Sequence, residues 1–141
     1  MRMLIDTNII LEAVLEQSKA HEARGLLTET EEHEFFISDF SLHSIGLFLF
    51  GRKQYHIFRE FLNDMVFGAG MLVASILPDE MESVAQAAQR FNLDFDDAYQ
   101  YVAAEKHDLT LVSFDTDFDR TERGRKTPAE ALEMLRAASG K

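Results

Sequence analysis

The chain has 141 residues, of which 46% are hydrophobic and 28% are charged, and its formal net charge at pH 7 is −11. This length is that of an ordinary domain, so we expect residues 1–141 to form one folded unit without membrane spans, since no stretch approaches the roughly 20 apolar residues that a span requires. The apolar N-terminal stretch contains Asp6 and Asn8, which excludes a signal peptide, and the absence of cysteine excludes disulfides and suits a cytoplasmic protein.

Apolar periodicity in the first half of the chain predicts strands that alternate with helices. The expected strands are residues 3–5 and 35–37, and the expected helices are residues 8–17, 20–32, a segment that runs to residue 50, and 53–67. Ser38 or Asp39 is a suitable cap for the third helix. Gly51 separates the third helix from the fourth, and Gly68 and Gly70 mark the end of the fourth.

The second half of the chain continues the alternation. The expected strands are residues 71–77 and 110–114, and the expected helices are residues 78–91, 95–107 and 128–138. Pro78 and Pro128 are suitable first residues of helices, and Asp94 is a suitable cap for the helix at 95–107. This order predicts an α/β fold of three layers, α/β/α, around a short parallel sheet of four to five strands.

Acidic residues follow two of the expected strands. Asp6 closes the first strand, Asp115 and Asp117 follow the last, and Asp97 is the third residue of a helix. The carboxyl ends of parallel strands share one edge of the sheet, where open α/β folds place their sites. Clustered carboxylates repel one another unless a cation holds them, and a set of oxygen ligands without His or Cys favours Mg²⁺ or Mn²⁺ over Zn²⁺.

Each of these residues also has a plainer interpretation. Asp6 alone is as well explained as a turn former, whereas Asp97 alone is better explained as a charge that answers the helix dipole. Asp117 also suits a solvated loop. Asn8 suits a helix cap or a partner that orients Asp6, and Ser113 suits a structural hydroxyl or a similar partner. The convergence of independent positions at one edge favours the metal site.

Three short motifs in this order resemble PIN domains, and their spacing resembles the VapC-type toxins of prokaryotic toxin–antitoxin pairs. The motifs are LIDTN at residues 4–8, DA at residues 97–98 and LVSFDTDF at residues 111–118. The resemblance implies a PIN-like fold and an endoribonuclease that depends on Mg²⁺ or Mn²⁺, forms a homodimer and binds a cognate antitoxin. It covers nearly the whole chain.

The resemblance also implies roles for individual residues. Asp6, Asp97, Asp115 and Asp117 match the family's metal-binding and catalytic carboxylates, and Asn8 and Ser113 match the polar residues that support them.

One position departs from the family pattern. PIN domains usually have Glu on the helix after the second strand, where this chain has Ser44. A serine hydroxyl supplies no charge and is too short to replace the carboxylate. We expect its presence to weaken cation binding, which keeps open a second interpretation: a catalytically weakened PIN-like module that binds RNA or protein. A phosphatase-like or receiver-like domain is a third interpretation, which is disfavoured because the acid pairs and the lysine that these folds need are missing.

Two further surfaces are predicted. Arg52, Lys53, Arg120, Arg123 and Arg125 are candidates for contacts with RNA phosphates, although each of them alone is as well explained as an ordinary solvating charge. The aromatic region at residues 45–67 is expected to be mostly core, and an exposed part of it marks a partner site, which the resemblance identifies as an antitoxin groove.

Overall fold

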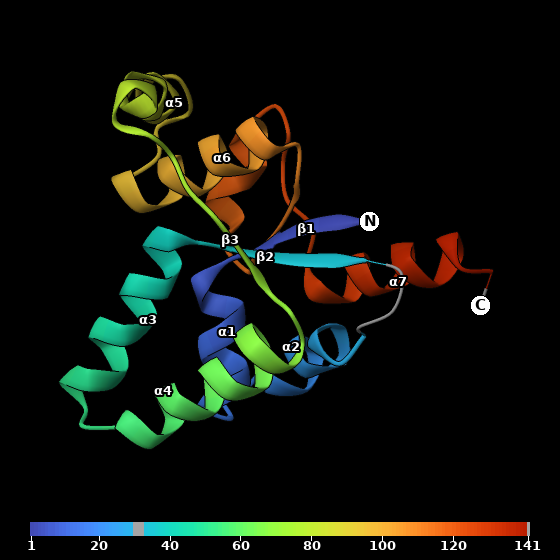
Figure 1. Ribbon diagram of the computed structural model, residues 1–141. Coiled ribbons are helices and arrows are strands. Elements are labelled where there is room, and N and C mark those ends of the chain that lie inside the picture. The colour runs from blue at the N-terminus through green and yellow to red at the C-terminus, as the bar shows by residue number, and fades with distance from the viewer. Residues whose placement is uncertain (30–32, 141) are drawn as a thin grey trace.

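A computed structural model describes residues 1–29 and 33–140. Its sheet contains four strands, which are all parallel in the order β3-β2-β1-β4 (Figure 1). The strands are β1 Arg2–Ile5, β2 Glu34–Ser38, β3 Leu72–Ala74 and β4 Thr110–Val112. The predicted parallel α/β architecture is therefore confirmed.

Seven α-helices flank this sheet in the described part of the chain. They are α1 Thr7–Val14, α2 Ala20–Leu27, α3 Asp39–Gly51, α4 Tyr55–Phe61, α5 Met81–Phe91, α6 Phe95–His107 and α7 Pro128–Ala138. Helices α5 and α6 cover one face of the sheet, and α1 to α4 with α7 cover the other (Figure 1). Among the described residues, no helix has the length and apolar character needed to traverse a bilayer.

The strand β1 shows why three layers form. Met3 and Ile5 belong to the core beneath α1 to α4 and α7, whereas Leu4 belongs to the core beneath α5 and α6. All three side chains are fully buried. Successive side chains of a strand point to opposite faces, so an unbroken apolar run requires helices on both faces.

Several predicted boundaries differ from those observed. The strand expected at 71–77 is β3, with three residues, and the strand expected at 110–114 ends at Val112. The helix expected at 8–17 ends at Val14. The helix expected at 20–32 ends at Leu27, and residues 30–32 lie outside the described residues.

The helix expected at 53–67 has a specific irregularity. Lys53 adopts a φ of 56°, so α4 begins only at Tyr55. The chain then widens into a π-helix, Leu62–Gly68, in which a side chain at Gly68 would lie 2.8 Å from the Asn63 carbonyl oxygen. Periodicity at 3.6 residues does not distinguish this wider turn from an α-helix.

Hydrogen bonds at the helix starts direct chain segments to the carboxyl edge of the sheet. Ser38, not Asp39, caps α3 by accepting the Ser41 backbone N–H at 2.9 Å. Asp94 caps α6 as predicted, by accepting the Asp97 N–H at 3.0 Å. The helix starts α1, α3 and α6 therefore converge with the end of β4, and this is where the candidate site lies.

Candidate metal centre

Asp6 is a buried carboxylate with three hydrogen-bond donors. It follows β1 directly and is only 7% exposed. Its Oδ2 accepts the Ser113 hydroxyl at 2.6 Å, and its Oδ1 accepts the Gln100 amide at 2.8 Å and the Thr7 backbone N–H at 2.8 Å. These donors fix the carboxylate and compensate part of the cost of burying it.

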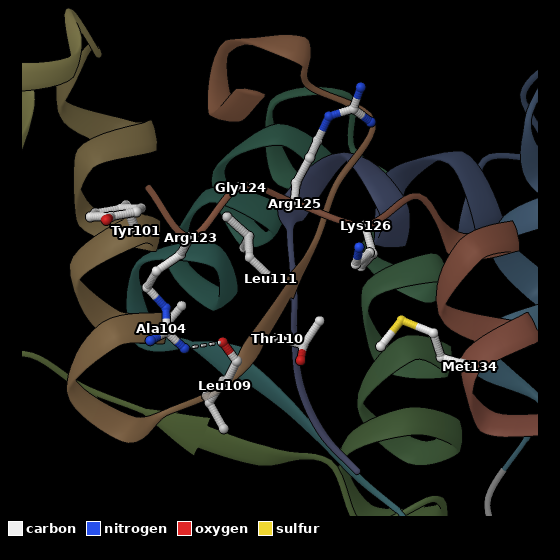
Figure 2. A pocket seen from close by; sticks show the side chains of 10 residues that line it. All are labelled: Tyr101, Ala104, Leu109, Thr110, Leu111, Arg123, Gly124, Arg125, Lys126 and Met134. Carbon is white, nitrogen blue, oxygen red and sulfur yellow. Dashed lines mark hydrogen bonds between the residues drawn. The ribbon is translucent and has the colours of Figure 1, made fainter. Parts of the chain in front are cut away.

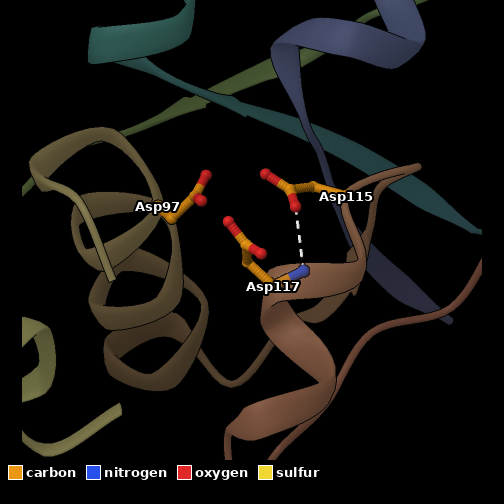
Figure 3. A group of neighbouring side chains, drawn as sticks. All are labelled: Asp97, Asp115 and Asp117. Atoms are coloured by element: carbon orange, nitrogen blue, oxygen red, sulfur yellow. Dashed lines mark hydrogen bonds between the residues drawn. The ribbon is translucent and has the colours of Figure 1, made fainter. Parts of the chain in front are cut away.

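Asp97, Asp115 and Asp117 form a compact acidic group. One carboxylate oxygen from each lies within 4.8 Å of the others. Figure 3 shows the three side chains pointing toward a common centre, Asp97 from α6, Asp115 from the loop after β4 and Asp117 from the short 3-10 helix Thr116–Arg120 that follows. Asp115 Oδ1 accepts the Asp117 backbone N–H at 2.8 Å, which holds that loop in a tight turn.

Asp6 shares one pocket with this group. The pocket has a volume of about 220 Å³ and contains, among its lining residues, Asp6, Asp97 and Asp115 together with Ser44. Asp6 after β1 and residues from α1, α3, α6 and the segment after β4 thus meet in one concavity, although they are far apart in the sequence.

The carboxylates of the acidic group repel one another, and Asp117 is the member that pairs with a cation, Arg120, at 3.0 Å. Burial, followed by the charge of Asp115, raises the pKa of Asp97 from 3.8 to about 8. Burial also raises the pKa of Asp6, against the opposing effect of its hydrogen bonds from Ser113, Gln100 and Thr7. Strongly raised carboxylate pKa values within a pocket are typical of functional sites.

Asn8 and Ser113 connect the two strand ends. Asn8 is the second residue of α1 and does not cap it, because that role belongs to Asp6. The Asn8 amide donates to the Ser113 hydroxyl oxygen at 3.2 Å, and its carbonyl accepts the Phe114 N–H at 3.3 Å. Ser113 also accepts the Asp115 N–H at 2.9 Å. The Ser113 hydroxyl, which also donates to Asp6, thus links Asp6 to Asp115.

Gln100 is a site residue that the sequence reasoning missed. It is 2% exposed, and its amide nitrogen donates to Asp6 Oδ1 at 2.8 Å and to the Ser41 hydroxyl at 2.7 Å. Its buried carbonyl oxygen has no hydrogen-bond partner among the described residues. The spacing of three from Asp97 places both side chains on one face of α6, and that spacing is the signal that could have found it.

Replacing Gln100 by Leu is expected to lower the affinity for Mn²⁺ by about 10- to 100-fold, because Asp6 loses a donor that orients it. Isothermal titration calorimetry measures this affinity directly. Gln54→Leu is the matched control, because Gln54 also has a buried carbonyl without a partner among the described residues. Equal Mn²⁺ affinities for the two variants would show that Gln100 does not orient the site.

The predicted RNA-contact residues are not gathered at the pocket. Arg52 and Lys53 follow the last turn of α3, where the Arg52 guanidinium lies 3.7 Å from the centre of the Phe48 ring. Arg120 donates to the Phe91 and Asn92 carbonyls and to Asp117. Arg52 therefore packs on α3, whereas Arg120 contacts the acidic group through Asp117.

Arg123 and Arg125 line a different pocket, of about 290 Å³, beside the start of β4 (Figure 2). Arg123 donates to the Leu109 carbonyl at 3.1 Å, which Figure 2 marks, and pairs with Asp108. Arg125 pairs with Asp119. Arg123 thus lies beside the start of β4, whereas Arg125 also donates to the Ser113 carbonyl at 3.1 Å, just after the end of that strand. Neither guanidinium group lines the acidic pocket.

The donor set fits a hard divalent cation. The available ligands are carboxylate oxygens that lie close enough together for one ion, and no imidazole or thiolate lines the pocket. Mg²⁺ is typically held by a few carboxylates while it keeps several waters, which suits a pocket of this size. Asp97, Asp115 and Asp117 are the nearest candidates to hold the ion, and Asp6 is the next.

Comparisons with known proteins agree with this geometry. The family model for the PIN domain matches residues 3–124. The chain therefore belongs to the PIN-domain family, which confirms the resemblance seen in its motifs. No curated protein matches the chain.

Solved structures share the fold across nearly the whole chain. A toxin–antitoxin complex from Klebsiella pneumoniae matches at a TM-score of 0.69 and 25% identity, covering 91% of this chain and 98% of that one. PAE2754 from Pyrobaculum aerophilum matches at a TM-score of 0.69 and 18% identity, over 97% and 90% of the two chains. VapBC2 from Rickettsia felis, bound to a DNA fragment from its promoter, matches at a TM-score of 0.68 and 15% identity, covering 89% of this chain and 97% of that one.

Proposed function

We propose that this protein is an endoribonuclease that depends on Mg²⁺ or Mn²⁺ and acts as the toxin of a toxin–antitoxin pair. The observation that carries the proposal is the convergence of Asp6, Asp97 and Asp115 on one pocket, with Asp117 beside it. A bound divalent cation at such a site makes water nucleophilic near neutral pH and neutralises charge on the phosphate. Membership of the PIN family and similarity to a toxin–antitoxin complex support the same assignment.

The chain's own residues hold and orient the reacting groups in this proposal. Asp97, Asp115 and Asp117 hold the ion, and Asp6 completes the acidic set in the same pocket. Ser113, Asn8 and Gln100 keep the carboxylates in place through the hydrogen bonds described above. Most of the positioning is therefore present before the ion binds, which limits the reorganisation needed during reaction.

A cytoplasmic antitoxin and a second copy of the chain are the proposed protein partners. The groove between α3 and α4 has a volume of about 430 Å³ and is mostly apolar, with Leu42, Leu47, Phe50 and Phe58 among its lining residues. Leu47 is 64% exposed and Phe50 is 51% exposed. Exposed apolar surface of this kind is typical of a protein interface, and we assign it to the antitoxin.

Cleavage of a defined single-stranded RNA tests the function. The wild-type protein with Mg²⁺ or Mn²⁺ is expected to cut the RNA, and a chelator or the change Asp115→Asn is expected to abolish cutting. Asp64→Asn is the matched control, because this substitution removes the same charge at an exposed position on the π-helix. Absence of cutting by the wild-type protein at high Mn²⁺ would contradict the proposal.

Ser44 favours a second candidate function, that of a weakened module that binds RNA or protein without cutting. Its side chain lines the pocket beside Asp6 and Asp97, at the position where PIN domains usually have Glu, so the pocket has one carboxylate fewer. Fewer ligand charges weaken the hold on a divalent ion.

Replacing Ser44 by Glu is therefore expected to raise Mn²⁺ affinity by about tenfold, because it adds a carboxylate ligand. Calorimetric titration of both proteins provides the comparison, and Ser44→Gln controls for side-chain size without charge. If Glu and Gln give the same affinity as Ser, the missing carboxylate does not limit metal binding.

A further inference from the structure

Two phenylalanines lie side by side at the edge of the acidic pocket. Phe40, in the first turn of α3, lines the pocket, and Phe95 is the first residue of α6. Their ring centroids are 6.0 Å apart with an interplanar angle of 65°. Helices α3 and α6 cover opposite faces of the sheet but begin near the same edge of it, as Figure 1 shows. The pair extends the pocket wall outward from the carboxylates.

The surrounding residues leave much of the Phe95 side chain exposed to solvent. Its side chain is 52% exposed, whereas Tyr99, one turn later in α6, is 5% exposed and anchors this part of the structure. The Tyr99 hydroxyl donates to Asp39 at 2.6 Å, and its ring lies 5.5 Å from that of Phe40. Tyr99 therefore fixes Phe40 in place, while one side of the Phe95 ring remains open to solvent.

The charges around Phe95 indicate what can cover it. Asp94 precedes it and Asp96 follows it. Asp96 is exposed, lines the pocket and has no ion pair or hydrogen bond through its side chain among the described residues. A phosphate at this position would be repelled by both carboxylates, whereas an uncharged planar group would not.

We propose that Phe95, supported by Phe40, is a stacking platform for one nucleobase of a single-stranded RNA whose phosphate lies at the acidic pocket. Aromatic side chains stack on unpaired bases whatever their sequence, because every base has a π-face. Phe40 belongs to both the pocket and the aromatic pair, so the platform is continuous with the phosphate site. This inference rests on the proposed ribonuclease function.

A protein partner fits this surface less well than a base. The platform presents one exposed ring whose two neighbours in the sequence are acidic, whereas the groove between α3 and α4 has a volume of about 430 Å³ and a mostly apolar lining. Protein interfaces have apolar cores depleted of charge, which the groove provides and the platform does not.

Fluorescence anisotropy of a labelled single-stranded RNA tests the platform. Titrations are made in Ca²⁺, which supplies a divalent charge, and a gel verifies that the RNA stays intact. Phe95→Ala is expected to weaken RNA binding by about 5- to 150-fold, the loss of one base–aromatic stack. Phe95→Tyr keeps the ring and is expected to bind like the wild type. Phe67→Ala is the matched control, because Phe67 is 73% exposed and does not line the pocket.

Two further readouts separate stacking from other roles. A 2-aminopurine at the stacked position should lose fluorescence with the wild-type protein and keep it with Phe95→Ala, while Mn²⁺ affinity stays the same in both. Equal RNA binding by Phe95→Ala and wild type overturns the platform and leaves the nuclease proposal standing. A change in oligomeric state with unchanged RNA binding identifies a protein interface instead and also overturns it. A wild-type protein that neither binds nor cuts RNA overturns both proposals.

Discussion

Replacing Asp97 by Asn is expected to abolish tight Mn²⁺ binding and, at the same time, to stabilise the metal-free protein at pH 8. Asn keeps the shape of the side chain but removes one of three carboxylates that lie within 4.8 Å of one another. Loss of a ligand should reduce the affinity by more than the roughly 10- to 100-fold that supporting residues contribute. Relief of repulsion should raise the melting temperature of the metal-free protein by roughly 2–4 °C, which corresponds to about 1 kcal/mol.

Thermal melts with Mn²⁺ and with a chelator measure both effects on the same samples. The wild-type protein should gain stability from Mn²⁺, because a ligand that binds only the folded state stabilises it, and the Asn variant should not. Asp64→Asn, far from the acidic group in the sequence and exposed, should behave like the wild type in both conditions. A variant at Asp97 that is less stable than the wild type without metal would show that repulsion is not the dominant interaction in the pocket.

Metal affinity and metal-free stability are expected to change with pH in opposite directions. The pKa of Asp97 is raised from 3.8 to about 8, so between these values the folded protein holds a proton that the unfolded chain has released. The stability contribution of this group is thus fully present below pH 3.8 and is lost as the pH rises through 8. The pKa of Asp6 is also raised, so its contribution to the stability of the folded protein is likewise lost as the pH rises.

Metal binding must displace that proton, so the apparent affinity for Mn²⁺ should rise by about tenfold per pH unit up to about pH 8. Calorimetry in buffers of different ionisation enthalpy counts the protons released. Urea unfolding with a chelator between pH 5 and pH 8 measures the stability, and Asp97→Asn should flatten its pH dependence. An affinity that is independent of pH over this range would mean that Asp97 is already ionised before the metal binds.

The sequence predicted the architecture well because its determinants are local. Short apolar runs identified all four strands of the described sheet, and the cap at Asp94 and the first-position proline at Pro128 identified two helix starts. Boundaries were less accurate where the local signal was ambiguous. The start of α4 after Lys53 and the π-helix that follows it depend on backbone angles that periodicity does not report.

The acidic residues of the site were predictable for a related reason. Side chains that follow parallel strands share the carboxyl edge of the sheet, so Asp6 and Asp115 could be paired before any contact was known. The contacts of the basic residues were harder to predict, because a positive side chain is attracted to any nearby carboxylate or carbonyl. The contacts of Arg123 with Asp108 and of Arg125 with Asp119 could not be read from spacing alone.

The sequence alone determined the succession of strands and helices along the chain, the fold class and the acidic character of one sheet edge. Each of these follows from short stretches of neighbouring residues. Only the tertiary structure decided that Gln100 donates to Asp6, that Ser113 links Asp6 to Asp115, and that Phe95 stands open beside the pocket. These are contacts between distant segments, and their geometry depends on how the helices pack on the sheet. A hydrogen bond between residues 94 positions apart leaves no periodic trace in either segment.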